Sequence, residues 1–215
     1  MTERLEKLFS LIPACDVFAD IGCDHGYIAQ KVLETDKAKK VYASDISAPS
    51  LKKAIGLIGN GYEGRFFTFV SDGFENLPKD IDTALIAGMG GEEICAIIRA
   101  ADKLPETLIL QPMKNADKVR RLLVSLGYGI DKDFTFYSAN KYYDVIRADN
   151  RLIGALYSET DYIYGKENVE KRGEDFLRFV KAKLKEQTAV VDKIKDENER
   201  ARVEKLIEEL KGFLK

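Results

Sequence analysis

One turn of the chain combines carboxylates and glycines in a pattern that suits a small charged ligand. It reads Asp20-Ile-Gly-Cys-Asp-His-Gly-Tyr27, follows an apolar run and precedes helical periodicity. A turn from strand to helix is where nucleotide-like ligands bind in many α/β proteins. The three-glycine dinucleotide pattern is absent, because Asp24 stands where its second glycine would be. Two carboxylates repel a pyrophosphate, which needs bare backbone N–H groups. The turn therefore favours a cationic ligand such as S-adenosylmethionine, which carries an ammonium and a sulfonium group.

Two further carboxylates follow the next two predicted strands. Asp45 lies 25 residues after Asp20, and Asp72 follows the third strand. An acid at the first position is suited to the ribose hydroxyls, a feature shared with NAD-binding enzymes, and one at the second can accept from an adenine amino group. Each aspartate could instead be only a helix cap. As an ordered set they predict a cofactor site made of Asp20, Gly22, Asp24, Gly26, Asp45, Ile46, Asp72, Gly73, Gly88 and Met89.

The predicted reactive side of this site is rich in glycine. After the fourth strand the chain reads Gly88-Met-Gly-Gly-Glu-Glu93, and the Asn/Asp-Pro-Pro motif typical of enzymes that methylate exocyclic amines is missing. Glycines let the backbone approach a flat ligand closely. The missing motif weighs against methylation of an exocyclic amine and allows a ring nitrogen as the nucleophile. Glu92 is a candidate catalytic acid, although both glutamates could serve only the helix N-terminus. Gln111 follows the fifth strand and could bind a base edge or close the turn. The candidate substrate-binding residues on this side are Tyr27, Gly90, Gly91, Gln111 and Pro112.

Short β-rich runs alternate with helical periodicity between residues 17 and 148, which predicts a mostly parallel, doubly wound α/β sheet. The first five runs are continuously apolar, as expected for strands buried on both faces, and the last two form a hairpin. The strand candidates are Val17–Ile21, Val41–Ser44, Phe66–Val70, Thr83–Ala87, Leu108–Leu110, Phe134–Tyr137 and Tyr142–Ala148.

Helical stripes separate these strands and then replace them. Ile28, Val32 and Leu33 mark one helix, and an opening helix ends before Pro13. The other stripes are Leu51, Ala54, Ile55 and Ile58; Ile94, Ile97 and Ile98; and Val119, Leu122, Leu123 and Leu126. After about Gly165 the chain is rich in Lys and Glu, and two apolar stripes indicate a coiled-coil-like helical hairpin. We therefore expect domains at 1–164 and 165–215.

Composition excludes several classes of protein but does not indicate a function. The 215 residues carry a net charge of −2, and no apolar run approaches the roughly 18 residues of a membrane span. There is no apolar signal core at the N-terminus. Cys15, Cys23 and Cys95 form no CxxC pair, and the chain has a single histidine, so neither a disulfide framework nor a metal site is expected. The cytoplasm is the expected compartment.

Five segments together resemble one family. They are Glu3-Arg4-Leu5, Ala19-Asp-Ile-Gly-Cys-Asp-His-Gly-Tyr27, Ile86-Ala-Gly-Met-Gly-Gly91, Leu108-Ile-Leu-Gln-Pro112 and Lys141-Tyr-Tyr-Asp-Val145. Their order is similar to that in the bacterial tRNA (adenine-N1)-methyltransferases that act at adenine 22. The resemblance implies a Rossmann-like class I methyltransferase sheet with a C-terminal helical hairpin, S-adenosylmethionine as cofactor and tRNA as partner. It also implies that Asp20 and Asp24 line the methionine part, Asp45 the ribose and Asp72 the adenine, and that Arg4 faces tRNA. The chain departs from the family at Cys23, Gly26, Asp45 and Met113.

The chemistry so implied needs alignment more than acid–base catalysis. An adenine N1 lone pair can attack a methyl group directly, and a carboxylate nearby would stabilise the resulting positive charge. Asp24 is the first catalytic candidate and Glu92 the second. N1 lies on the Watson–Crick edge, so the base must be unpaired or flipped, and Tyr27 could stack on it.

Basic residues near the crevice or on the C-terminal helices could bind phosphate. The candidates are Arg4, Lys7, Lys114, Lys118, Arg120, Arg121, Lys171, Arg172, Arg178, Lys181, Lys183 and Lys185. Three other functions stay open: methylation of a small molecule or another RNA, an NAD-linked oxidoreductase, and a non-catalytic RNA-binding module.

Overall fold

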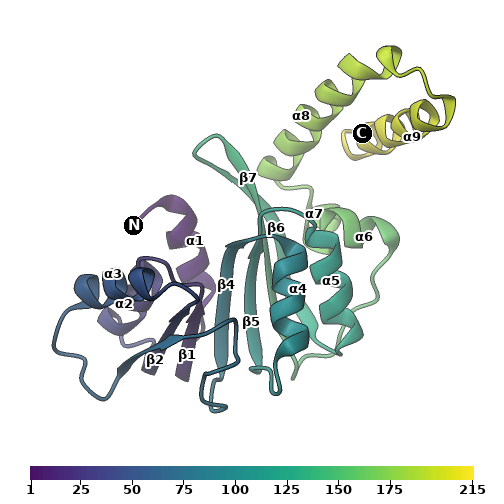
Figure 1. Ribbon diagram of the computed structural model, residues 1–215. Helices are drawn as coiled ribbons and strands as arrows, with labels where there is room; N and C mark the ends of the chain where they lie inside the picture. Colours follow the sequence, from purple (N-terminus) through teal and green to yellow (C-terminus); the bar gives the residue numbers. More distant parts are fainter.

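The computed structural model describes residues 1–215 and contains one seven-stranded mixed sheet (Figure 1). The strands lie in the order β3-β2-β1-β4-β5-β7-β6. Neighbouring strands among β1 to β5 are parallel, and β7 is antiparallel to both β5 and β6. The strands are β1 (Cys15–Ile21), β2 (Ala38–Asp45), β3 (Phe66–Val70), β4 (Thr83–Met89), β5 (Thr107–Pro112), β6 (Gly129–Ser138) and β7 (Lys141–Asp149). All seven predicted strands are confirmed, as is the terminal hairpin.

Five helices cover the two faces of the sheet. Helices α1 (Glu3–Leu11), α2 (Tyr27–Glu34) and α3 (Ala48–Ile58) pack with one face through an apolar cluster that includes Leu8, Val32 and Leu51. Helices α4 (Gly91–Ala100) and α5 (Ala116–Ser125) pack on the other through Ile94 and Val119. The predicted helical stripes thus correspond to helices.

Side chains near the helix ends explain several of these boundaries. The hydroxyl of Thr2 accepts from the backbone N–H of Leu5, and that of Ser47 accepts from Ser50, so both act as N-caps of α1 and α3. Helix α1 ends two residues before Pro13, and Gly127 adopts a positive φ of 81° just beyond α5.

The structure corrects the expected burial of strand β3. Strand β3 is an edge strand, so its side chains are only partly covered, and Val70 is exposed. The segment between β3 and β4 holds turns instead of a helix. Two members of the predicted stripes are exposed: Ile55 of α3, and Leu126, which is the C-cap that follows α5.

The C-terminal segment is entirely helical. It contains α6 (Glu159–Tyr164), α7 (Lys166–Lys171), α8 (Glu174–Val190), a 3-10 turn η1 (Val191–Lys193) and α9 (Glu197–Phe213). Helices α8 and α9 form the predicted helical pair, which projects beyond the sheet next to the tip of the β6–β7 hairpin (Figure 1). Its core joins Phe176, Val180 and Leu210 to Tyr164 and Phe213.

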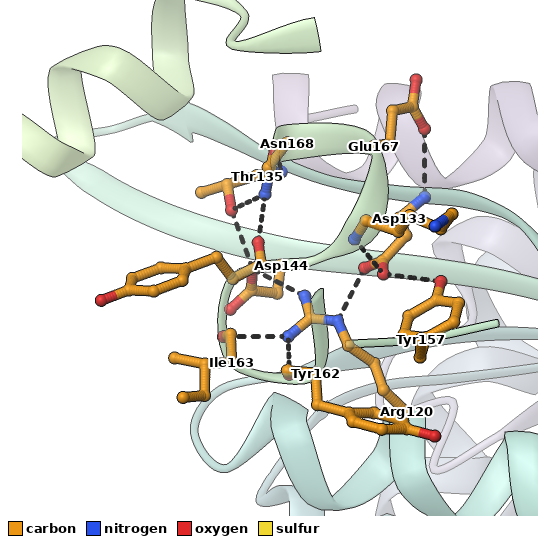
Figure 2. A network of polar contacts seen from close by, with 11 residues as sticks. Arg120, Asp133, Thr135, Asp144, Tyr157, Tyr162, Ile163, Glu167 and Asn168 are labelled. Carbon is orange, nitrogen blue, oxygen red and sulfur yellow. Dashed lines mark hydrogen bonds and ion pairs between the residues drawn. The ribbon is translucent and has the colours of Figure 1, made fainter. Parts of the chain in front are cut away.

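A buried polar network fastens the first part of this segment to the sheet (Figure 2). Arg120 of α5 is fully buried, and its Nε donates to Asp133 Oδ1 of β6 at 2.8 Å. Its Nη1 donates to the carbonyl oxygens of Tyr162 and Ile163 in α6. Asn168 of α7 accepts from the backbone N–H of Thr135 at 3.0 Å. Arg120 is therefore a structural residue, and the prediction that it contacts phosphate is wrong.

The division at residues 164 and 165 stays a prediction. The network shows, however, that α7 is joined to β6 through Asn168, beyond that boundary. None of the helices is both long and apolar enough to cross a bilayer.

Candidate active site

A large cavity lies where the parallel strands end at their carboxyl termini. Its volume is about 1200 Å³, large enough for a nucleoside-sized ligand and part of a second one. It brings together most of the residues predicted from sequence. These are Arg4, Asp20, Gly22, Asp24, Tyr27, Asp45, Ile46, Asp72, Gly73, Gly88 and Met89.

Asp20 is buried in the wall of this cavity because it belongs to β1, an interior strand that pairs with β2 and β4. It is only 6 % exposed, and no Lys, Arg or His nitrogen lies within ion-pair distance of its carboxylate. Burial, opposed by a backbone hydrogen bond and assisted by the charge of Asp45, raises the pKa of Asp20 to about 7. A cationic group of a ligand would restore the charged form, so Asp20 is suited to bind an ammonium group.

Asp45 organises the turn as well as lining the cavity. Its Oδ1 accepts from the backbone N–H of Ser47 at 2.8 Å, and its Oδ2 accepts from that of Asp24 at 3.2 Å. Each carboxylate oxygen has more than one lone pair, so both can still accept hydroxyl hydrogens. Asp72 follows β3 and is exposed in the same cavity.

Asp24, His25 and Tyr27 form a small group on the wall of the cavity. Asp24 has a positive φ of 47°, and its Oδ2 lies 2.7 Å from Nδ1 of His25. The rings of His25 and Tyr27 are stacked with centroids 5.7 Å apart. The Asp24 side chain lines the cavity and is 66 % exposed, so the protein itself does not remove this carboxylate from water. The group therefore offers a carboxylate and two flat rings to a ligand.

Gly88 interrupts the ladder between β4 and β5. Ala87 pairs with Gln111 and Met89 pairs with Pro112, so Gly88 is an extra residue with a positive φ of 82°. Such a bulge bends the strand end and changes the direction of the side chains that follow. Met89 then covers Gly22, where a Cβ atom would lie 2.1 Å from Met89 Cε. The backbone at both turns is thereby brought close to the cavity.

Arg4 reaches the cavity from α1. Its Nη1 donates to Oε1 of Gln111 at 2.5 Å, and its guanidinium carbon lies 5.8 Å from the centre of the Tyr143 ring. Gln111 itself is completely buried and does not line the cavity. The structure thus favours a positioning role for Gln111 over contact with a base edge.

Five other predicted site residues also lie outside the cavity: Gly26, Gly90, Gly91, Glu92 and Pro112. A Cβ on Gly26 would lie 2.6 Å from Cβ of Ala54, so this glycine allows α2 to pack against α3. A Cβ on Gly91 would lie 2.3 Å from the carbonyl oxygen of Asn115, so Gly91 brings α4 close to the β5–α5 turn. Both glycines therefore have packing reasons to be there.

Glu92 points away from the cavity and forms an ion pair with Lys118 of α5. That pair lowers the pKa of Glu92, so its carboxylate stays charged as a surface partner. The neighbouring Glu93 lines the cavity instead. The structure gives no support to a catalytic role for Glu92.

Among the cavity residues that sequence reasoning missed are Glu75, Glu93, Ser138 and Tyr143. Glu93 was noted only with the helix start, and Ser138 and Tyr143 come from the β6–β7 hairpin. The signal for Tyr143 was the segment Lys141-Tyr-Tyr-Asp-Val145. No group of three or more His, Cys, Asp or Glu side chains is arranged to hold a metal ion.

The strand order β3-β2-β1-β4-β5-β7-β6, with an acidic cavity at the ends of the parallel strands, defines a Rossmann-like methyltransferase class. The chain belongs to the methyltransferase-domain family, whose model matches residues 1–146.

Two relatives share sequence with more than two thirds of this chain. A Mycoplasma pneumoniae protein provisionally named a tRNA methyltransferase is 32 % identical over 171 residues, which cover 77 % of this chain and 79 % of that protein. The tRNA (adenine(22)-N(1))-methyltransferase of Bacillus subtilis is 32 % identical over 154 residues, covering 69 % of this chain and 65 % of the relative.

Solved structures share the whole architecture. The m1A22 tRNA methyltransferase TrmK of B. subtilis superposes with a TM-score of 0.84 and 24 % identity, covering 100 % of this chain and 99 % of the other. TrmK of M. capricolum, solved with S-adenosylhomocysteine, gives a TM-score of 0.89 at 22 % identity and covers 99 % and 97 %. Because both identities are below 25 %, the likeness bears on the fold alone. It confirms the predicted fold, including the C-terminal helical hairpin.

Proposed function

We propose that this chain transfers a methyl group from S-adenosylmethionine to N1 of an adenine in tRNA, at adenine 22. The observation that carries the proposal is the buried, cation-free carboxylate of Asp20 in a methyltransferase-family cavity. The relatives that are named for a tRNA substrate supply the substrate class. A cytoplasmic location is part of the same proposal.

The residues of the cavity fit S-adenosylmethionine. Asp20 lacks a protein cation and would hold the ammonium group of the methionine part. Asp45 keeps acceptor capacity for ribose hydroxyls, and Asp72 is free to accept from an adenine amino group. The positive φ angles of Gly22 and Gly88 bring backbone close to the ligand, as side chains there would not allow. When bound, this cofactor supplies an electrophilic methyl group.

The protein's task is then to orient the adenine and to accommodate charge. An adenine N1 lone pair needs no prior deprotonation, so alignment supplies most of the rate enhancement. Asp24 presents an exposed carboxylate on the cavity wall and would stabilise the positive charge that develops on the methylated ring. His25 and Tyr27 offer flat surfaces against which a flipped base could stack.

The test is methyl transfer from labelled S-adenosylmethionine to unmodified tRNA, followed by nucleoside analysis. We expect N1-methyladenosine with one methyl group per tRNA. The matched control is the same tRNA with guanine at position 22, which should accept no label. Label at another nucleotide would refute the proposed position. Absence of label together with tight binding of S-adenosylhomocysteine would favour a small molecule or another RNA as substrate.

A further inference from the structure

Ser138 is a buried serine that reaches the cavity with its hydrogen-bonding capacity unused. Three serines of the chain are buried: Ser44, Ser71 and Ser138. The hydroxyl of Ser71 donates to the carbonyl oxygen of Gly73 at 3.1 Å. Ser44 Oγ has no hydrogen bond, but Ser44 does not line the cavity. Ser138 is only 6 % exposed and does line it. Among the three, Ser138 is therefore the serine placed to meet a ligand.

The polar side chains around Ser138 are satisfied within the hairpin, whereas the Ser138 hydroxyl is not. The hydroxyl of Tyr137 donates to Asn140 Oδ1 at 2.9 Å, and that of Thr135 donates to Asp144 Oδ1 at 2.8 Å. No protein group forms a hydrogen bond with Ser138 Oγ, although the residue belongs to the same strand. Removing a hydroxyl from bulk water is costly unless it makes a hydrogen bond, so this group is suited to a polar atom of a ligand.

The β6–β7 hairpin fixes the direction of this side chain. Its two-residue turn, Ala139–Asn140, has φ angles of 47° and 62°, as a type I′ turn requires. Phe136 pairs with Tyr143, and Ser138 pairs with Lys141. Alternate residues of a strand share one face, so Ser138 lies on the same face as Phe136 and Tyr143. Tyr143 also lines the cavity. The register of the hairpin thus places the Ser138 hydroxyl in the cavity wall beside Tyr143.

The strand order indicates which ligand this wall faces. The carboxylates suited to the cofactor, Asp20, Asp45 and Asp72, belong to β1, the end of β2 and the turn after β3. In the order β3-β2-β1-β4-β5-β7-β6, the hairpin lies beyond β4 and β5, on the other side of the sheet from these acids. The cavity of about 1200 Å³ exceeds what one nucleoside-sized ligand needs. The hairpin wall is therefore available to the second ligand, which is the base that receives the methyl group.

We propose that the Ser138 hydroxyl accepts a hydrogen bond from the N6 amino group of the target adenine and thereby contributes to its selection. This inference rests on the proposed function. The N6 amino group is attached to the carbon next to N1, so it stays close to the methyl-transfer position when N1 is aligned. A hydroxyl has two acceptor lone pairs and no charge, so it binds an amino group without competing for the N1 lone pair. Ser138 is a specificity-determining residue in this arrangement.

The experiment combines a protein variant with a changed base. Ser138→Ala removes the hydroxyl. Ser10→Ala is the matched control, because Ser10 is exposed on α1, bonds only the Lys7 carbonyl oxygen and does not line the cavity. Three synthetic tRNAs carry adenine, 7-deazaadenine or unsubstituted purine at position 22. All three keep N1, purine lacks the N6 amino group, and 7-deazaadenine keeps that group but lacks N7. Labelled methyl transfer under single-turnover conditions gives kcat/KM for each pair of protein and tRNA. Circular dichroism checks folding, and calorimetry measures binding of S-adenosylhomocysteine.

We expect Ser138→Ala to lower kcat/KM by roughly 3- to 10-fold on the adenine and 7-deazaadenine tRNAs, which is the effect of one neutral hydrogen bond. The purine tRNA should react equally with Ser138→Ala and the wild-type chain, because the partner of the hydroxyl is already missing. The cycle of two proteins and two bases cancels the different reactivity of the two N1 atoms. Binding of S-adenosylhomocysteine should not change, and Ser10→Ala should match the wild-type chain throughout.

Several outcomes would contradict the proposal. An equal loss on the adenine and purine tRNAs, or no loss on either, would show that the hydroxyl does not bind the N6 amino group. A loss on adenine but not on 7-deazaadenine would assign the contact to N7 instead. Weaker binding of S-adenosylhomocysteine in Ser138→Ala would place the hydroxyl at the cofactor. Failure of the proposed function is distinguishable, because the wild-type chain would then leave the adenine tRNA unmethylated.

Discussion

At the scale of single residues, the burial of Asp20 couples ligand binding to folding. Strand β1 carries this carboxylate into a place where only 6 % of the residue is exposed and no protein cation compensates it. Without a ligand, the folded protein therefore bears the free-energy cost of ionising a buried acid at neutral pH. An ammonium group of a ligand would remove that cost.

The raised pKa of Asp20 predicts how stability changes with pH. The folded-state pKa of about 7 exceeds the ordinary value of 3.8, so this group's favourable contribution is complete below about pH 4. It is lost as pH rises through 7. Without ligand, Asp20→Asn should therefore raise the Tm much more at pH 8 than at pH 4.5, by roughly 2–4 °C per kcal/mol of relieved cost.

The measurement is thermal denaturation followed by circular dichroism at both pH values. Asp16→Asn is the control, because Asp16 is exposed at the start of the same strand and pairs with Lys39. The same Asp20→Asn variant should bind S-adenosylhomocysteine roughly 10- to 100-fold more weakly. A lower Tm at pH 8 would mean that the ionised carboxylate has a stabilising partner.

Asp24 permits a separate test of catalysis, because it is exposed and its backbone conformation also suits asparagine. Asp24→Asn keeps the shape and the backbone N–H that Asp45 accepts. We expect a decrease in kcat on the order of 10²-fold with little change in binding of S-adenosylhomocysteine. Single-turnover methylation at saturating tRNA measures this. Unchanged kcat with intact binding would exclude the proposed electrostatic role.

At the scale of elements, the periodicities in the sequence predict the strands and helices well. Short apolar runs locate every strand, and apolar residues at three-to-four spacing locate the helices α1 to α5, since burial against the core requires those patterns. The same patterns do not reveal that β3 is an edge strand, because strand order depends on contacts between distant segments. Short helices such as α6 and α7 lack a stripe long enough to detect.

The candidate site shows the same division between local and non-local information. Carboxylates at the ends of β1, β2 and β3 were predictable, since the ends of parallel strands meet at one edge. The choice between Glu92 and Glu93 was not, because successive helix residues point about 100° apart and the rotation of α4 on the sheet is set by packing. The Arg4–Gln111 bond joins residues 107 positions apart and has no local signal.

The Arg120 network makes a prediction about how α5, β6 and α6 are joined (Figure 2). Asp133→Ala leaves the fully buried guanidinium without its nearest carboxylate. Breaking such a pair costs about 3–5 kcal/mol, which lowers the Tm by roughly 6–20 °C. Arg121→Met is the matched control, since Arg121 pairs with Glu159 at the surface and should cost less than about 1 kcal/mol. Thermal denaturation compares the two, and similar losses would contradict the interpretation.

At the scale of the whole molecule, the β6–β7 hairpin connects the cavity to the helical pair. Ser138 and Tyr143 line the cavity, while Tyr142 packs edge-on against Phe179 of α8 with ring centres 5.4 Å apart. Arg178 of α8 lies over the Tyr137 ring at 3.6 Å. The helical pair is thus held against the hairpin that contributes Ser138 and Tyr143 to the cavity.

Three basic residues of α8 share one face, because Arg178, Lys181 and Lys185 follow three- and four-residue spacing. None of them has an ion-pair partner, unlike Lys183, which pairs with Glu186. Cations on one helix face that lack carboxylate partners suit an RNA backbone. We predict that the triple alanine variant raises the KM for tRNA and leaves the affinity for S-adenosylhomocysteine unchanged.

Salt dependence identifies the cause of that effect. If the three residues each contact a phosphate, the slope of log K for tRNA against log salt falls by about 2–3. Arg202→Ala with Lys205→Ala on α9 is the control, because these residues are also exposed and unpaired but are surrounded by acids along their helix. Long-range attraction of RNA depends on the net charge of the protein. An equal effect of both variants would therefore mean that α8 contributes only to the overall electrostatic field. A larger effect of the α8 variant would mean that the sheet positions the target base while the helical pair holds the rest of the RNA.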